Sequence, residues 1–224
     1  MLHLEGLVHR FAGRSADMPA ALDIPALGIA PGRLTVVRGP SGSGKTTLLY
    51  ILSGLVRPSA GRVVWDGTDI AALSEGGRDR WRRGKAGFVF QNFNLIEEMS
   101  PFANVTVAAY FSALTDRAVR SRAAELLAQF GVADERRQVG SYSRGEQQRV
   151  ALARALIFDP PILFADEPTA SLDTANADAL CVAFRRLAGQ GRTVVAVSHD
   201  PLLIAAADEV IALDHGRQVA ERAA

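Results

Sequence analysis

The fold of this chain is decided by the stretch Gly39-Pro40-Ser41-Gly42-Ser43-Gly44-Lys45-Thr46. It matches the pattern G-x-x-x-x-G-K-[ST] in full, and it lies between a β-branched apolar segment and an apolar helical pattern. Glycines allow backbone N–H groups to wrap around an anion, and the start of a helix adds the positive end of its dipole. The stretch therefore predicts a phosphate-binding loop between a strand and a helix.

Two side chains of this loop have expected contacts with a nucleoside triphosphate. The Lys45 ammonium suits the β- and γ-phosphates, and the Thr46 hydroxyl suits Mg²⁺. The predicted nucleotide-binding residues here are Gly39, Pro40, Ser41, Gly42, Ser43, Gly44, Lys45, Thr46 and Thr47. A purely structural glycine-rich turn is the alternative, and the complete, correctly flanked motif argues against it. The loop alone does not distinguish GTPases, kinases and ATPases.

Strand and helix patterns alternate around the loop. Strands are predicted at residues 34–38, 62–67, 87–91, 162–165, 193–197 and 209–213. Helices are predicted at residues 45–55, 117–130, 145–158 and 174–187. This alternation predicts an α/β core with a mainly parallel sheet. The continuous apolar run at 162–165 is typical of a strand that is buried on both faces.

Composition narrows the class of protein. A chain of 224 residues suits one domain, and 48% apolar with 22% charged residues are globular proportions. With 25 basic and 24 acidic residues the net charge is +1, which gives no sign of nucleic-acid binding. Cys181 is the single cysteine, which favours a reducing compartment. Because no apolar run reaches about 18 residues and the N-terminus does not resemble a secretory signal, we expect a cytoplasmic protein.

An acidic pair, Asp166-Glu167, follows the buried strand pattern at 162–165. In parallel sheets the carboxyl ends of the strands form the edge where ligands bind. Asp166 suits a Mg²⁺ ligand, and Glu167 suits a group that orients or deprotonates an attacking water. An isolated pair would be an ordinary charged strand end, and the phosphate loop upstream favours the catalytic role.

Two further polar residues follow predicted strands. Gln91 comes directly after Phe88-Val89-Phe90, and its neutral amide could reach both a metal ion and a water. His199 comes after the strand predicted at 193–197, where it could donate to a γ-phosphate oxygen. Taken alone, each would be an ordinary loop residue.

The segment Ser143-Arg144-Gly145-Glu146 has the spacing of a capping box, which predicts that a helix starts here. The free amides at such a helix start attract phosphate groups. The alternative is that Ser143 serves only as a helix cap.

Together these segments resemble the ATP-binding-cassette (ABC) ATPases over essentially the whole chain. The landmarks stand in family order: the phosphate loop, Gln91, a signature-like segment at 142–149, Asp166-Glu167, a D-loop-like segment at 171–173, and His199. The resemblance implies a P-loop NTPase with a RecA-like core, a mainly parallel sheet, an antiparallel β edge and an inserted α-helical subdomain. It implies one ABC ATPase domain over residues 1–224, with the core at 1–91 and 159–224 and the helical signature subdomain at 92–158.

The resemblance also implies site roles. Glu167, His199 and Gln91 would be catalytic, and Thr46, Gln91 and Asp166 would hold Mg²⁺ beside ATP. Two cassettes would form a homodimer around two ATP molecules, with Ser143, Gly145 and Glu146 of each subunit on the nucleotide of the other. The family signature typically reads Leu-Ser-Gly-Gly-Gln, so Arg144 stands where glycine is usual, and arginine does not adopt glycine-only backbone angles cheaply.

Phe11, expected on the first strand, resembles the adenine-stacking aromatic of the family. Its alternative role is core packing.

Residues 88–96 and the short chain look most like the lipoprotein-releasing and macrolide-export branch of the family. That branch implies a permease subunit on a separate chain, with the cassette peripheral on the inner face of the cell membrane. A coupling helix of the permease would dock between the core and the helical lobe. The candidate lining is Phe93, Leu95, Ile96, Met99 and Phe102, for which packing within the lobe is the alternative.

The sequence therefore predicts an ATP-hydrolysing subunit that powers transport or extrusion by a membrane partner. One alternative is a cassette that acts as a mechanical switch on a membrane partner, in cell division or envelope signalling, without moving a substrate. A cassette of DNA repair, chromosome maintenance or translation is less well supported, because coiled-coil, zinc-binding and duplicated-cassette features are missing and the net charge is only +1. A simple P-loop kinase would not need the signature, D-loop and switch histidine together.

Overall fold

The computed structural model describes residues 1–11, 19–111, 116–132 and 137–219. Its strands are β1 (Leu2–His9), β2 (Leu22–Ile29), β3 (Leu34–Arg38), β4 (Ala60–Trp65), β5 (Thr68–Asp69), β6 (Ala86–Val89), β7 (Ile162–Asp166), β8 (Thr193–Val197), β9 (Glu209–Asp214) and β10 (Arg217–Val219). Its α-helices are α1 (Lys45–Leu52), α2 (Glu75–Lys85), α3 (Pro101–Thr106), α4 (Asp116–Gln129), α5 (Arg144–Ala155), α6 (Thr174–Gly189) and α7 (Pro201–Ala206). Two 3₁₀ turns, η1 (Val107–Phe111) and η2 (Val139–Ser141), separate α3, α4 and α5.

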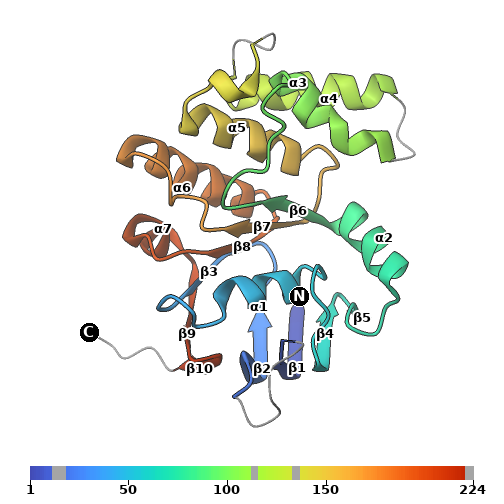
Figure 1. Cartoon of the computed structure of the whole chain (residues 1–224), viewed down its shortest axis with the longest axis vertical. Helices are drawn as coiled ribbons and strands as arrows, with labels where there is room; N and C mark the ends of the chain where they lie inside the picture. The colour runs from blue at the N-terminus through green and yellow to red at the C-terminus, as the bar shows by residue number, and fades with distance from the viewer. Residues whose placement is uncertain (12–18, 112–115, 133–136, 220–224) are drawn as a thin grey trace.

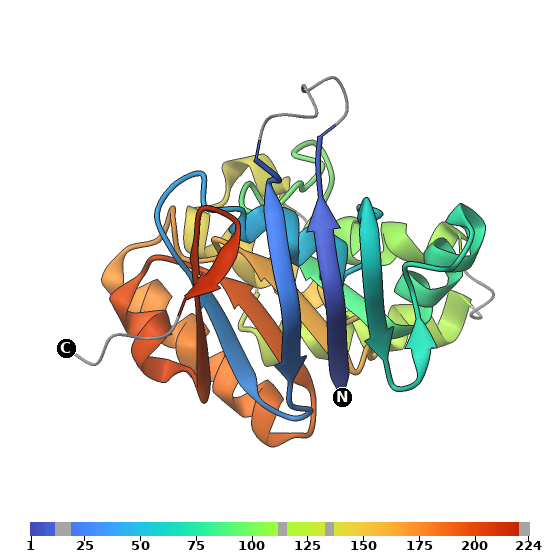
Figure 2. The ribbon, with the colours of Figure 1, turned by 90° about the horizontal axis from the view of Figure 1, so that it is seen from below.

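The strands form two sheets. The larger sheet has the order β10-β9-β3-β8-β7-β6, in which only the β9–β10 pair is antiparallel. The smaller sheet, β2-β1-β4-β5, is antiparallel and lies in front of the larger one when the molecule is seen from below (Figure 2). The predicted α/β class, with a mainly parallel sheet and an antiparallel β edge, is confirmed.

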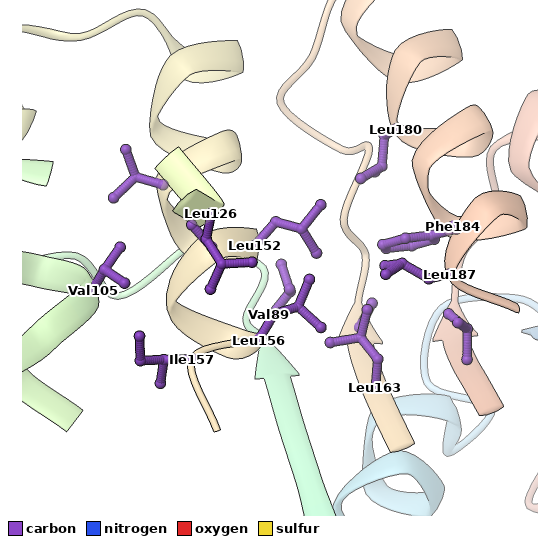
Figure 3. Packing of buried hydrophobic residues seen from close by; sticks show 14 of the residues in the cluster. Val89, Val105, Leu126, Leu152, Leu156, Ile157, Leu163, Leu180, Phe184 and Leu187 are labelled. Carbon is purple, nitrogen blue, oxygen red and sulfur yellow. The ribbon is translucent and has the colours of Figure 1, made fainter. Parts of the chain in front are cut away.

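The central strand β7 shows why this sheet is buried on both faces. Leu163 and Ala165 belong to the apolar cluster on the side of α5 and α6, and Ile162 and Phe164 belong to the cluster on the side of α1. Figure 3 shows Leu163 together with residues of α5 and α6 in the first of these clusters. Successive side chains of β7 point to opposite faces of the sheet, and all of them are apolar at 162–165. Both faces of the strand are therefore buried, as the sequence pattern predicted.

The helices α3, α4 and α5 follow β6 and precede β7 in the chain, and they stand together at one end of the molecule (Figure 1). Their apolar side chains are continuous with the sheet core, because Val105 of α3 and Leu152 of α5 share a cluster with Val89 and Leu163. In the described part of the chain, no helix is long and apolar enough to cross a membrane.

Several predicted element ends differ from the structure. The helix predicted at 45–55 ends at Leu52, because the chain turns at Gly54 with a left-handed φ of 71°. The strand predicted at 87–91 ends at Val89, which pairs with Ala165 near the end of β7, so Gln91 lies two residues beyond it. Phe11 was wrongly expected on the first strand, because the pairing of β1 ends at His9.

Candidate active site

The first feature of the site is the open N-terminus of α1. Gly44 precedes the helix with a left-handed φ of 97°, and no side chain caps it. The first amides of a helix have no intrahelical partner. Gly39 lets the chain pass close to β9, since a Cβ there would lie 2.1 Å from the carbonyl oxygen of Leu213. The loop therefore presents uncapped helix-start amides.

The same loop also carries the positive charge of Lys45. The Lys45 ammonium donates to the carbonyl oxygens of Gly39, at 2.9 Å, and Pro40, at 3.1 Å. The Ser43 hydroxyl is buried, and no described residue is its hydrogen-bond partner. The loop thus contains a cation bonded only to its own backbone, a buried polar group without a partner and uncapped amides. Such a set fits an anion as large as a triphosphate.

Thr46 and Asp166 form the second feature. The Thr46 hydroxyl donates to Oδ1 of Asp166 at 2.9 Å, although the two residues are 120 positions apart. Asp166 ends β7 and is 2% exposed. Burial raises the pKa of Asp166 above its ordinary value, and hydrogen bonds from Thr46 and Tyr50 partly oppose this rise.

These oxygen atoms fit a hard cation that arrives with phosphates. Mg²⁺ usually takes one or two carboxylates and completes its shell with phosphate oxygens and water. In the part of the chain that the structure describes, no group of three His, Cys, Asp or Glu side chains is placed to hold a metal ion alone. A nearby cation would also relieve the cost of the buried Asp166 charge.

Glu167 and His199 form the third feature. Nδ1 of His199 lies 2.9 Å from Oε2 of Glu167, which joins the ends of β7 and β8. Glu167 has a φ of 44°, rare for a residue other than glycine, and its backbone N–H donates to the carbonyl oxygen of Val197 at 2.9 Å. Such strained backbone persists only where surrounding contacts hold it. The Glu167 carboxylate is therefore held at the edge of the sheet.

One pocket of about 650 Å³ brings most predicted site residues together. It lies at the carboxyl ends of β3, β6 and β7, where ligands of parallel sheets bind. The predicted residues that line it are Phe11, Ser41, Gly42, Gly44, Lys45, Thr46, Thr47, Gln91 and Glu167. Phe11 is 46% exposed and meets the His9 ring edge-on, with 5.1 Å between centroids. Its position suits a flat ligand better than core packing.

The pocket also contains residues that the sequence did not indicate. His215 lines it from the turn between β9 and β10, and Ala21 lines it from the segment before β2. The turn is held there because the Gly216 N–H donates to the carbonyl oxygen of Ser43 at 3.0 Å. No local sequence pattern signals this contact, since it depends on a hairpin that folds back onto the loop.

The predicted capping box at the start of α5 is confirmed. The Ser143 hydroxyl accepts from the Glu146 N–H at 3.3 Å and donates to Oε2 of Glu146 at 2.7 Å. The same Oε2 accepts from the Ser143 N–H at 2.8 Å. These hydrogen bonds from Ser143 lower the pKa of Glu146, so its carboxylate is charged at neutral pH.

Arg144 and Gly145 fit their positions at the start of α5 for different structural reasons. Arg144 is the first residue of α5 and does not have a positive φ, so the position does not require glycine. Its guanidinium lies 5.9 Å from the centroid of the Phe93 ring. Gly145 packs against α6, because a Cβ there would lie 2.3 Å from Oδ1 of Asn176.

The start of α5 does not line the nucleotide-sized pocket, so Ser143, Gly145 and Glu146 lie outside it. The helix is nevertheless bonded to loops that do reach the pocket. Gln148 donates to the carbonyl oxygen of Pro168 at 2.8 Å, just after Glu167. Arg154 donates to the carbonyl oxygens of Phe93 and of Asn94, the latter at 2.6 Å.

Two other cavities hold none of the predicted site residues. One, of about 390 Å³, lies between α5 and α6 and is mostly apolar. The other, of about 360 Å³, lies between α2, β6 and the end of α5. The candidate docking residues do not line this second groove: Phe93 is only 2% exposed, and Phe88, Phe90 and Phe158 line it instead. Phe93 thus packs in the interior, whereas Ile96 and Met99 are exposed, so a docking role for this stretch stays a prediction.

Comparison with known proteins agrees with this geometry. A family model described as "ABC transporter" matches residues 22–170. The chain is 40% identical over 223 residues to a macrolide export ATP-binding/permease protein of Paracoccus denitrificans, covering 99% of this chain and 33% of that protein. It is 43% identical over 188 residues to an uncharacterized ABC transporter ATP-binding protein of Mycobacterium tuberculosis, covering 84% of this chain and 57% of that protein.

The chain thus spans between a third and three fifths of the length of these curated relatives. A solved dimeric ATP-binding cassette, in a post-hydrolysis state with ADP and Pi, superimposes with a TM-score of 0.89 at 33% identity. That match covers 99% of this chain and 98% of the other. With its phosphate loop, its paired sheets and these relatives, the chain belongs to the ABC transporter family, as an ATP-binding cassette.

Proposed function

We propose that this chain binds and hydrolyses ATP as a subunit of a membrane ABC transporter, powering transport or extrusion by a separate membrane subunit. The observation that carries the proposal is one pocket lined by Lys45, Thr46 and Glu167. Asp166 and His199 do not line it, but Asp166 accepts a hydrogen bond from Thr46, and His199 lies 2.9 Å from Glu167. A triphosphate, a divalent cation and a water would each find a matched group there.

The chain's own residues would divide the chemistry as follows. Lys45 and the loop amides bind the phosphates, and the Phe11 ring stacks on the base. Thr46, Asp166 and Gln91 would hold Mg²⁺, which when bound neutralises charge on the phosphate oxygens. Glu167 accepts the proton of the attacking water, and His199 orients the Glu167 carboxylate and donates to the γ-phosphate.

A homodimer would complete the site. Ser143, Gly145 and Glu146 lie outside the pocket of their own chain, which leaves them available to a nucleotide held by a second cassette. The dimeric cassette that superimposes with a TM-score of 0.89 supports this arrangement. Binding of ATP would then favour the closed dimer, and hydrolysis would favour its opening.

The partner is a permease subunit on another chain, and no nucleic acid is involved. The relative from Paracoccus denitrificans is named an ATP-binding/permease protein, and this chain matches a third of its length. We propose that residues 1–91 and 159–224 form the nucleotide-binding core and that residues 92–158 form the helical signature subdomain. The groove between α2, β6 and α5 is then the docking surface, with the chain peripheral on the inner face of the membrane.

The test is Glu167→Gln, with the rate of ATP hydrolysis and the affinity for a fluorescent ATP analogue both measured. We expect hydrolysis to fall at least about 100-fold while binding is retained, because a general base contributes roughly 10²–10⁴-fold. Light scattering with ATP should show a stabilised dimer. Glu98→Gln, on an exposed turn, is the control and should keep the wild-type rate. A wild-type rate in Glu167→Gln would show that the base is elsewhere.

A further inference from the structure

The cavity between α5 and α6, of about 390 Å³, has an apolar lining that reaches the molecular surface. Figure 3 shows Leu152 of α5 pointing toward Leu187 of α6, and both of these buried residues line the cavity. Phe130, at the end of α4, lines it as well, and so does Val182, which is 61% exposed. Small-molecule sites typically measure about 300–1,000 Å³ and are lined predominantly by apolar side chains. In size and lining, this cavity therefore suits a small ligand.

Two guanidinium groups line the same cavity. Arg149 comes from α5, and Arg186 comes from the last turn of α6. Nη1 of Arg149 donates to Oδ1 of Asn176 at 3.2 Å. Arg186 is exposed, and the described part of the chain offers it no hydrogen-bond or ion-pair partner. Since none of the described lining residues is acidic, one guanidinium is left without a counter-ion beside an apolar space.

The spacing of the lining residues along α6 gives the cavity a direction. Asn176, Ala179, Ala183 and Arg186 line it and follow one another at intervals of three or four residues. Residues at this spacing lie on one face of a helix. The cavity therefore runs along α6, over the two small alanine side chains, and ends at the Arg186 guanidinium.

We propose that this cavity binds a small amphipathic carboxylate, whose apolar body lies over Ala179 and Ala183 and whose carboxylate pairs with Arg186. This goes beyond the proposed function, because the cavity shares no lining residue with the nucleotide pocket. Guanidinium recognises a carboxylate through two parallel hydrogen bonds, and removing the apolar body from water is favourable. A neutral apolar molecule would leave Arg186 without a partner, and inorganic phosphate would gain nothing from the apolar lining.

Such a ligand would join parts of the chain that are distant in sequence. Phe130 and Leu152 line the cavity from α4 and α5, and Leu187 lines it from α6. A ligand that binds only the folded chain stabilises that chain by mass action. We therefore expect the ligand to raise the Tm of the chain without nucleotide.

The experiment uses the full chain without nucleotide and two probes, 2-naphthoate and 2-naphthamide, which share an apolar body and differ in charge. By isothermal titration calorimetry we expect naphthoate to bind about fivefold more tightly, as an exposed guanidinium–carboxylate pair allows. Arg186→Gln should abolish this preference and leave the affinity for naphthamide unchanged. Arg80→Gln, at an exposed position of α2 outside the cavity, is the matched control and should keep the preference. Ala183→Leu should weaken binding of both probes about tenfold, because its larger side chain takes up space in the cavity.

The proposal is overturned if wild type binds the two probes equally or binds neither, or if Arg80→Gln removes the preference as fully as Arg186→Gln does. Unchanged binding of both probes by Ala183→Leu would also overturn it. Naphthoate should raise the Tm of wild type more than that of Arg186→Gln, and equal increases would contradict the pairing with Arg186. Cosedimentation of wild type with phosphatidylglycerol vesicles, without a preference between the probes, would identify a lipid surface instead. All of these measurements are made without ATP, so they stand apart from the test of the proposed function.

Discussion

The two helix starts at which the proposed mechanism places a phosphate are built in opposite ways. α1 begins after Gly44 without a side-chain cap, beneath a lysine bonded only to backbone and beside the unsatisfied hydroxyl of Ser43. α5 begins with a complete capping box, in which Ser143 and Glu146 satisfy each other. The start of α1 can bind an external anion, whereas the start of α5 is already capped by the Ser143 hydroxyl and the Glu146 carboxylate.

The two helix starts are therefore expected to contribute differently to nucleotide affinity and to folding stability. An uncapped helix end leaves polar groups unsatisfied, which costs stability until a ligand arrives. A capped end is stable without ligand, because the Ser143 hydroxyl and the Glu146 carboxylate already satisfy each other. We therefore expect the α1 end to determine nucleotide affinity in the single chain, and the α5 end to determine how well the helix is held for a second subunit.

The largest expected effect is on ATP affinity, at the uncapped start of α1. Lys45→Ala should weaken ATP binding about 100-fold, because a charge-assisted contact contributes roughly 1.5–3 kcal/mol. Titration with a fluorescent ATP analogue measures this. Lys85→Ala removes the only other lysine, at the exposed end of α2, and should leave the affinity unchanged. Equal affinities in wild type and Lys45→Ala would show that the open end does not bind the phosphates.

The second effect concerns the capped start of α5, and it tests whether packing against α6 holds this helix in place. Gly145→Ala should lower the free energy of unfolding by about 1–3 kcal/mol, because the new methyl group would meet the Asn176 amide, which Asp173 already holds. Urea unfolding measures the loss, and Asn176→Ala in the same chain should recover part of it. Gly84→Ala, where nothing lies within 4 Å of the added Cβ, should be neutral or stabilising. A neutral Gly145→Ala would remove the packing explanation.

A matched pair of serines compares the two ends directly. Ser143→Ala should lower the free energy of unfolding by about 1 kcal/mol, since it removes a helix cap. Ser43→Ala should leave it unchanged or raise it, because that hydroxyl is buried without a partner among the described residues. Both are measured by urea unfolding without nucleotide. If the two variants lost the same stability, the ends would not differ as described.

The smallest expected effect concerns the carboxylate of Asp166, which accepts a hydrogen bond from Thr46 of α1. Burial raises the pKa of Asp166 in the folded chain, so its charged form costs stability above that pKa. Asp166→Asn should raise the Tm without nucleotide by about 1–2 °C at neutral pH, which is below about 1 kcal/mol. The gain should fade as the pH drops through the raised pKa, because the wild-type carboxyl then becomes neutral too. A Tm difference that is constant from acidic to neutral pH would contradict this origin.

Features that depend on neighbouring residues were predicted well from the sequence. The capping box needs only positions three apart, and the strands β3 and β8 match their predicted bounds because their apolar runs are bounded by polar or turn residues. Several elements were not predicted, among them α2 and β2. α2 has no buried residue and therefore no apolar period, and β2 contains Pro25 and Gly28, which interrupt a strand pattern.

By itself, the sequence determined the phosphate loop, the α/β class and the resemblance to ABC ATPases, because these rest on local spacing and on apolar periods. Only the tertiary structure decided which distant groups meet. Thr46 reaches Asp166 across 120 residues, and Glu167 reaches His199 across 32, since adjacent parallel strands end at one edge of the sheet. The turn that brings His215 to the pocket and the groove between α2, β6 and the end of α5 likewise depend on packing between elements, which no local pattern encodes.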